Sequence, residues 1–156
     1  MTKLRAAMAA AMLIGVPLSA AQAQTVVNFE GTILASCTLS VSPGVLAMST
    51  SGTELGTEQS GGGAATLGIT ATGGTPTVKF TAPSMAAKPT AYTRTPPVSL
   101  KYTSTGGANQ AYTTGASQYT STNPLGDTVT LHAEAVDATG FAAGSYRLST
   151  TATCQQ

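Results

Sequence analysis

The stretch that decides the fold is VVNFEGTILASCTLSV, residues 26–41. Apolar and small residues recur at every second position along it, and they are Val27, Phe29, Ile33, Ala35, Cys37, Leu39 and Val41. Successive side chains of a β-strand point to opposite faces, so a period of two places this set on one face of a strand. We therefore expect residues 26–41 to form the first strand of a β-rich domain, with Phe29 and Ile33 in its core.

Shorter segments with the same alternation follow along the chain. They are residues 65–73, 76–83, 97–104, 127–137 and 145–154, and Gly-Gly, Pro-Pro and Asn-Pro pairs separate them. Their expected core residues are Val78, Phe80, Leu100, Val129, Leu131, Tyr146 and Leu148, together with Leu39 from the first segment. Short strands at this spacing, with turn residues between them, are typical of a single immunoglobulin-like antiparallel β-sandwich.

Two regions do not alternate clearly. Residues 49–63 are rich in Ser, Thr and Gly, and we expect a connection there with a short strand at about residues 53–58. Residues 103–127 are polar, and we expect either a long exposed loop or a hairpin with polar faces.

The chain has two cysteines, Cys37 in the first segment and Cys154 in the last. Both fall on the apolar faces of their segments, so the two sulfur atoms are expected to meet inside one domain and form a disulfide. Free thiols and pairing between chains are the alternatives. A disulfide indicates an oxidising compartment.

The N-terminus agrees with export. Lys3 and Arg5 precede the apolar run AAMAAAMLIGVPLSA, and Ala21-Gln22-Ala23 is a small-x-small cleavage pattern. These features predict a secretory signal peptide over residues 1–23 and a mature domain over residues 24–156 without a membrane span. The expected location is the periplasm, the cell surface or the extracellular space.

Charged residues make up only 8% of the chain, whereas roughly 25% is usual in soluble proteins. Without Lys3 and Arg5 the mature chain holds five basic and six acidic residues, with no basic cluster. This balance argues against nucleic acid as a partner. A surface with so few charges can pack against other chains without desolvating many ions.

The residues that usually perform chemistry are sparse. The single histidine, His132, lies on the polar side of its segment, and Glu54 and Glu58 are the nearest approach to a carboxylate pair. We therefore name no catalytic, metal-binding or cofactor-binding residue, and we expect a protein that is not an enzyme. The best binding candidates are Tyr112, Tyr119 and Gln110, because aromatic rings beside amides can hold a sugar.

The opening stretch resembles the first strand of chaperone–usher fimbrial subunits, with Phe29, Glu30, Gly31, Ile33 and Cys37 in the matching places. The ending FAAGSYRLSTTATCQQ, residues 141–156, is similar to the closing strand of the same group and to that of spore-coat-U-like secreted proteins. The resemblance implies a complete or incomplete immunoglobulin-like sandwich that serves as a surface-fibre subunit. Its implied partners are a periplasmic chaperone and like subunits, which bind by adding a strand to the sandwich.

The alternative is a self-complete secreted binding module that recognises a glycan or a surface protein through its loops. A bridge from Cys37 to Cys154 favours this alternative, because it would tie the first and last strands side by side. Only Gln24 and Thr25 precede the apolar alternation, so residues 24–33 themselves would have to be the donated strand.

Overall fold

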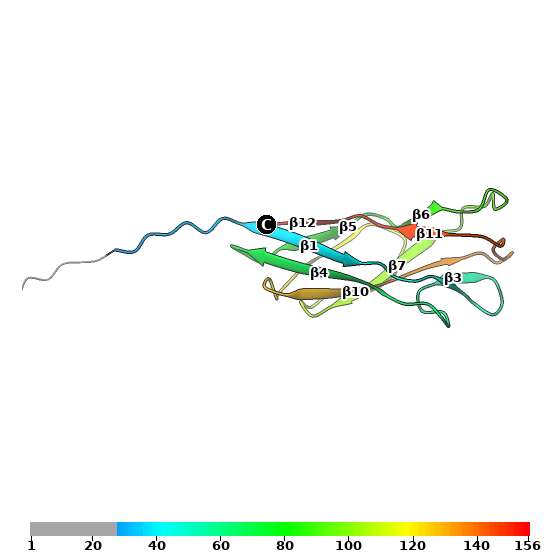
Figure 1. Ribbon diagram of the computed structural model, residues 1–156, viewed down its shortest axis with the longest axis horizontal. Helices are drawn as coiled ribbons and strands as arrows, with labels where there is room; N and C mark the ends of the chain where they lie inside the picture. The colour runs from blue at the N-terminus through cyan, green and yellow to red at the C-terminus, as the bar shows by residue number, and fades with distance from the viewer. Residues whose placement is uncertain (1–27) are drawn as a thin grey trace, which may run out of the picture. The chain divides into compact units, whose positions relative to one another are not determined.

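The computed structural model describes residues 28–156, and the expected signal peptide lies outside them. Within these residues all regular structure is β-strand (Figure 1). The strands are β1 (Ser36–Ser42), β2 (Ala47–Met48), β3 (Glu54–Gly56), β4 (Ala65–Thr72), β5 (Thr77–Phe80), β6 (Ser84–Ala87), β7 (Val98–Ser104), β8 (Asn109–Thr113), β9 (Ser117–Thr120), β10 (Asp127–Val136), β11 (Arg147–Ser149) and β12 (Ala152–Gln155).

The strands form two layers. Within each layer, all paired strands are antiparallel. One layer is a seven-stranded sheet in the order β1-β4-β10-β3-β2, to which β7 and β8 are added beside β10. The other layer contains β12-β5-β9 and the shorter pair β11-β6. The prediction of an all-β antiparallel domain is confirmed.

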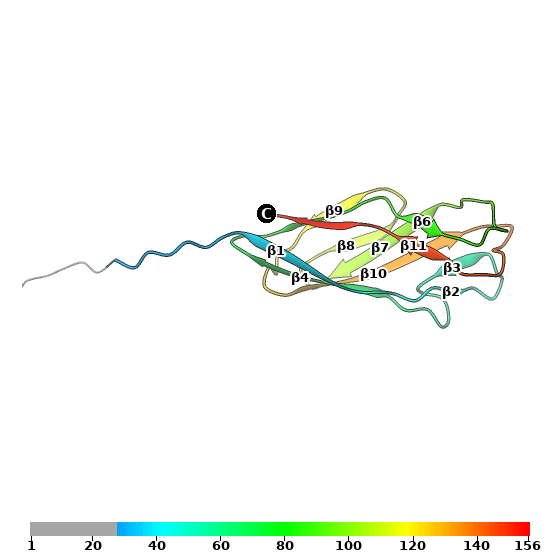
Figure 2. The same cartoon turned by 45° about the horizontal axis from the view of Figure 1, so that its top comes forward.

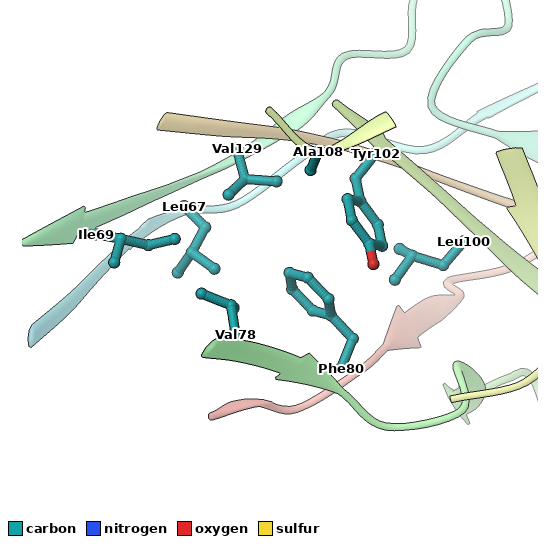
Figure 3. Close-up of a cluster of buried hydrophobic side chains, with 8 residues drawn as sticks. All are labelled: Leu67, Ile69, Val78, Phe80, Leu100, Tyr102, Ala108 and Val129. Carbon is teal, nitrogen blue, oxygen red and sulfur yellow. The ribbon is translucent and has the colours of Figure 1, made fainter. Parts of the chain in front are cut away.

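The core lies between the two layers, and Figure 3 shows side chains from both meeting there. Val78 and Phe80 project from β5, and Phe80 packs on Tyr102 of β7 with ring centroids 4.7 Å apart. The buried cluster consists of Leu67, Ile69, Val78, Phe80, Leu100, Tyr102, Ala108 and Val129. Four of the predicted core residues, Val78, Phe80, Leu100 and Val129, are therefore confirmed as buried.

The first strand is shorter than its sequence pattern predicts. It begins at Ser36, and residues 28–35 form no strand, so Phe29 and Ile33 are 93% and 81% exposed instead of lying in the core. The reason is the absence of a partner. β4 ends at Thr72, opposite Ser36, and the chain then turns at Gly73, whose φ of 91° is left-handed.

The polar region 103–127 is not one long exposed loop. Its first part completes a hairpin, because β8 pairs with β7 across a turn at residues 105–108, whereas β9 belongs to the other layer and pairs with β5 (Figure 2). The short strand expected near residues 53–58 is present as β3.

Buried carboxylates hold the loops at both ends of β10. At its start, the Asp127 carboxylate accepts hydrogen bonds from the Gly106 amide at 2.7 Å and from the Tyr119 hydroxyl at 2.7 Å. Just after its end, the Asp137 carboxylate accepts bonds from the Tyr92 hydroxyl and from Arg94.

These contacts decide the protonation of both acids. Burial alone would raise the pKa of Asp127, but the bonds from Tyr119, Ser121, Gly106 and Thr105 outweigh burial and leave the pKa below its usual value. The bond from Tyr92, followed by that from Thr139, holds the pKa of Asp137 well below its usual range.

Candidate functional site

The two layers do not close on each other along one side of the domain. Among the described strands, β1 pairs only with β4, β12 only with β5 and β11 only with β6. One edge of β1 and one edge of the β11–β12 segment therefore carry backbone groups without a strand partner. Such edges are a template for pairing with a further strand.

An apolar groove of about 850 Å³ lies between these two edges. Leu39, Val41 and Val45 line one wall, and Tyr146, Leu148 and Ala152 line the other. The floor of the groove is formed by residues of β4, β5, β7 and β10, namely Ala65, Leu67, Phe80, Leu100, Leu131 and Ala133.

The groove is open to solvent along the β1 wall. Leu39 is half-buried, but Val41 is 70% exposed and Val45 is 57% exposed. Exposed aliphatic side chains gathered around an apolar hollow are typical of a binding surface. The shape and the unpaired edges fit an extended peptide, which would satisfy the backbone groups and place alternate side chains in the groove.

One end of the groove is closed by the disulfide. Cys37 of β1 and Cys154 of β12 are bonded, which confirms the predicted pair, and their Cα atoms are 6.1 Å apart. Beyond the disulfide, the Gln156 side chain donates a hydrogen bond to the Ser36 carbonyl at 2.9 Å. Figures 1 and 2 show β12 running beside β1 up to the C-terminus.

Residues 28–35, which we call the arm, have no strand partner in the described structure. Phe29 and Ile33 occupy alternate positions of the arm, on the face opposite to that of Leu34. All three side chains are exposed, Leu34 by 78%. The arm thus has the alternation of a β-strand with one apolar face, and that face is exposed.

The structure does not bring the predicted binding residues together. Tyr112 lies on β8, where its ring is 5.1 Å from the Lys101 ammonium and its hydroxyl donates to Glu58 at 2.8 Å. Tyr119 lies on β9 in the other layer and packs against the core, with its ring 5.9 Å from that of Tyr102. The Gln110 amide donates to the carbonyl of its neighbour, Ala111.

The tyrosine pKa values follow from these surroundings. Burial, followed by the hydrogen bond to Glu58, raises the pKa of Tyr112. Burial and then the bond to Asp127 do the same for Tyr119. Both hydroxyls therefore remain protonated donors at neutral pH.

His132 lies beside Glu58, and the two glutamates bond to different partners. The Glu58 carboxylate accepts two hydrogen bonds from Lys101, each 2.7 Å long, which with the bond from Tyr112 lower its pKa. His132 lies 3.2 Å from the Thr57 hydroxyl and 4.0 Å from Glu58. Glu54 instead accepts a bond from Gln59. Glu54 and Glu58 thus bond to different partners, although the charges of both act on the Tyr112 hydroxyl.

The groove residues were missed by sequence reasoning because most of them look like ordinary core residues. Leu131, Tyr146 and Leu148 were expected in the core, but they are only partly buried and line the groove. The pair Val41 and Val45 is the sequence signal that could have revealed the groove. These two aliphatic residues lie on either side of Pro43 and Gly44, and β1 ends just before Pro43.

Within residues 28–156 no cluster of three or more His, Cys, Asp or Glu could hold a metal ion. The same residues contain no helix of the length and apolar character needed to cross a membrane.

Comparisons with known proteins give no relative for this chain. No protein-family model matches it, and neither the curated proteins nor the solved structures contain a significant match.

Proposed function

We propose that this protein is a non-enzymatic, pilin-like fibre subunit of the bacterial cell surface, exported after removal of residues 1–23. Its domain is an immunoglobulin-like sandwich that lacks one strand along the groove. The arm of a second copy fills the gap and links one subunit to the next. A periplasmic chaperone that covers the groove before assembly remains a prediction of the family resemblance.

The observation that carries this proposal is the match between the groove and the arm. The groove offers two strand edges and an apolar floor, and the arm offers an unpaired extended segment with Phe29 and Ile33 on one face. An inserted arm would hydrogen-bond along both edges and bury these two side chains. Burial of two such side chains stabilises by about 3–6 kcal/mol, before the cost of ordering the arm is subtracted.

The shorter first strand also provides the segment that is donated. The sequence pattern predicts a first strand that starts at Val26, with only Gln24 and Thr25 of the mature chain before it. In the structure, β1 begins at Ser36. Residues 24–35 are then available for donation, of which residues 28–35 are described.

The alternative of a glycan-binding module receives less support. Tyr119 is directed into the core and Tyr112 lies in the other layer, so these two rings do not form one sugar platform.

The test uses the mature chain, residues 24–156, produced by export. We expect wild type to form multimers that persist in SDS without heating, and F29S/I33S to remain monomeric, because its arm has lost its apolar anchors. Loss of about 3–6 kcal/mol corresponds to association weakened on the order of 10²–10⁴-fold. Light scattering after size exclusion gives the mass of each species.

The matched control is Leu34→Ser, which removes an exposed apolar residue from the opposite face of the same arm. L34S should assemble like wild type. On the groove side, Val41→Lys should block assembly, whereas Val136→Lys, at an exposed position outside the groove, should not. A wild-type chain that stays monomeric at all concentrations, or an F29S/I33S chain that assembles normally, would refute the proposal.

A further inference from the structure

The disulfide leaves no room for a strand at one end of the groove. Neighbouring strands in a sheet lie about 4.8 Å apart, so a strand inserted between two edges and bonded to both needs about 9.6 Å between them. The Cα atoms of Cys37 and Cys154 are 6.1 Å apart. No strand can pass between β1 and β12 at this point.

The arm is attached at this closed end. Ala35 immediately precedes β1, and the Leu34 carbonyl accepts a hydrogen bond of 3.1 Å from the Thr72 hydroxyl at the end of β4. Ala35 also lies so close to Gly73 that a Cβ there would come within 3.0 Å of the Ala35 Cα. These contacts hold the root of the arm on the far side of the disulfide from Leu39, where the groove begins.

We propose that the Cys37–Cys154 disulfide excludes the arm from its own groove and thereby commits it to the groove of a second copy. This inference rests on the proposed function, in which the arm is the strand that the groove accepts. The disulfide then acts as an assembly device that suppresses self-closure of a monomer.

The length of the arm closes the other route, which is insertion from the open end. β1 ends at Ser42, so its open end beside Val41 lies about 20 Å from Ala35, at roughly 3.3 Å per residue. Phe29 precedes Ala35 by six residues and Ile33 by two, so these two anchors can lie at most about 22 Å and about 7 Å from Ala35. Neither anchor can turn around the open end and run back along the groove towards Leu39.

The arm of a second copy meets neither obstacle. It comes from outside, enters at the open end beside Val41 and Val45, and stops at the disulfide. The same bond that suggests a self-complete domain in the sequence therefore favours assembly between copies once its position beside the arm is known.

The decisive variant keeps the disulfide and lengthens the connection to the arm. About 20 Gly and Ser residues inserted between Ala35 and Ser36 have a root-mean-square span of about 25 Å and a much longer maximum reach. The arm can then enter its own groove from the open end, at an effective concentration in the millimolar range. We expect this linker variant to be a closed monomer up to about 100 μM, a several-fold drop in mass from wild type.

A closed monomer is distinguished from an open one by a labelled peptide of residues 24–35. The peptide should fail to bind the linker variant, but should bind the linker variant that also carries F29S/I33S, whose own arm is inert. A second variant, C37A/C154A without a linker, removes the closed end, and its share of closed monomer should rise if it folds. If it does not fold, the linker variant decides alone.

The outcomes separate this inference from the proposed function. A linker variant that still forms multimers of wild-type mass would overturn this inference alone, because assembly of the wild-type chain would be unaffected. Wild-type monomers with an intact disulfide that refuse the peptide, because their own arm fills the groove, would overturn the inference and, with it, assembly between copies. If F29S/I33S changes neither mass nor peptide binding in any background, the proposed function itself fails.

Discussion

At the scale of single residues, two neighbouring core tyrosines differ in one hydrogen bond. The Tyr102 hydroxyl is buried without a partner among the described residues, whereas the Tyr119 hydroxyl donates to Asp127 at 2.7 Å. We expect Y102F to leave the free energy of unfolding unchanged or to raise it by up to about 1 kcal/mol, because it removes an unsatisfied polar group. Y119F should lower it by about 1–3 kcal/mol, because a bond to a carboxylate is lost.

Urea unfolding of the two variants measures both effects. They are matched controls for each other, since each removes one oxygen from a tyrosine and the two rings lie 5.9 Å apart. Equal destabilisation by Y102F and Y119F would show that the Tyr102 hydroxyl has a partner, such as a bound water molecule.

Sequence reasoning could not place the Tyr119 ring against the core, for a physical reason. Tyr119 and Asp127 lie in a polar region without clear alternation, for which polarity predicted an exposed loop or a hairpin with polar faces. In the folded chain, a tyrosine buries its ring and keeps its hydroxyl bonded, so it can occupy the core beside a buried acid. The partner that makes this burial favourable is brought near only by the fold.

At the scale of elements, the unpaired edges give a direct test of where a strand is added. Addition of the residue 24–35 peptide to F29S/I33S should slow amide hydrogen exchange in β1 and in β11–β12, because new hydrogen bonds form along both edges. The strands β8 and β9 are the internal control, since each also has a single partner but neither lines the groove. Mass spectrometry of peptic fragments measures the exchange. Protection that appears in β8 or β9 instead would place the added strand on the opposite side of the domain.

The same edges explain how far the sequence could predict the elements. Alternation indicated that β4, β5, β7 and β10 are strands and which face of each points inward, because a strand buried on one face has apolar residues at every second position. The pattern in residues 26–41 was equally regular, yet only its second half became β1. Alternation shows that a segment can bury one face, but it does not show whether the surface that covers this face belongs to the same molecule.

The groove could not be predicted for the same reason. It arises where two strands lack a neighbour, and the lining residues Leu131 and Leu148 look like core residues in the sequence. The disulfide was predictable from two inward-facing cysteines, but its place at the end of the groove was not. That place depends on β1 and β12 running side by side in space, although their cysteines are 117 positions apart in the sequence.

At the scale of the whole molecule, the disulfide and two buried carboxylates connect parts of the chain that are distant in the sequence. The chain has few charged residues besides these carboxylates. The disulfide closes a loop of more than a hundred residues, for which loop entropy gives about 4–5 kcal/mol of stabilisation. Asp127 and Asp137 hold the loops at the two ends of β10, the strand that pairs with β3, β4 and β7. The disulfide does not titrate, but the two carboxylates do.

Stability should therefore fall in acid. Both carboxyl groups have folded-state pKa values below their usual range, which is about 3.9 in the unfolded chain, so the unfolded chain binds more protons as the pH falls. The stabilisation is fully present above about pH 5 and is lost as the pH drops through the unfolded and then the folded pKa values. We expect the unfolding temperature to be level from pH 5 to 7 and to decrease towards pH 2. The control Asp137→Asn should be less stable at pH 7, because Arg94 loses its anion, and should lose less on acidification. An unfolding temperature that is the same at pH 6 and pH 2 would show that neither carboxylate stabilises its end of β10, and an equal decrease in D137N would show this for Asp137.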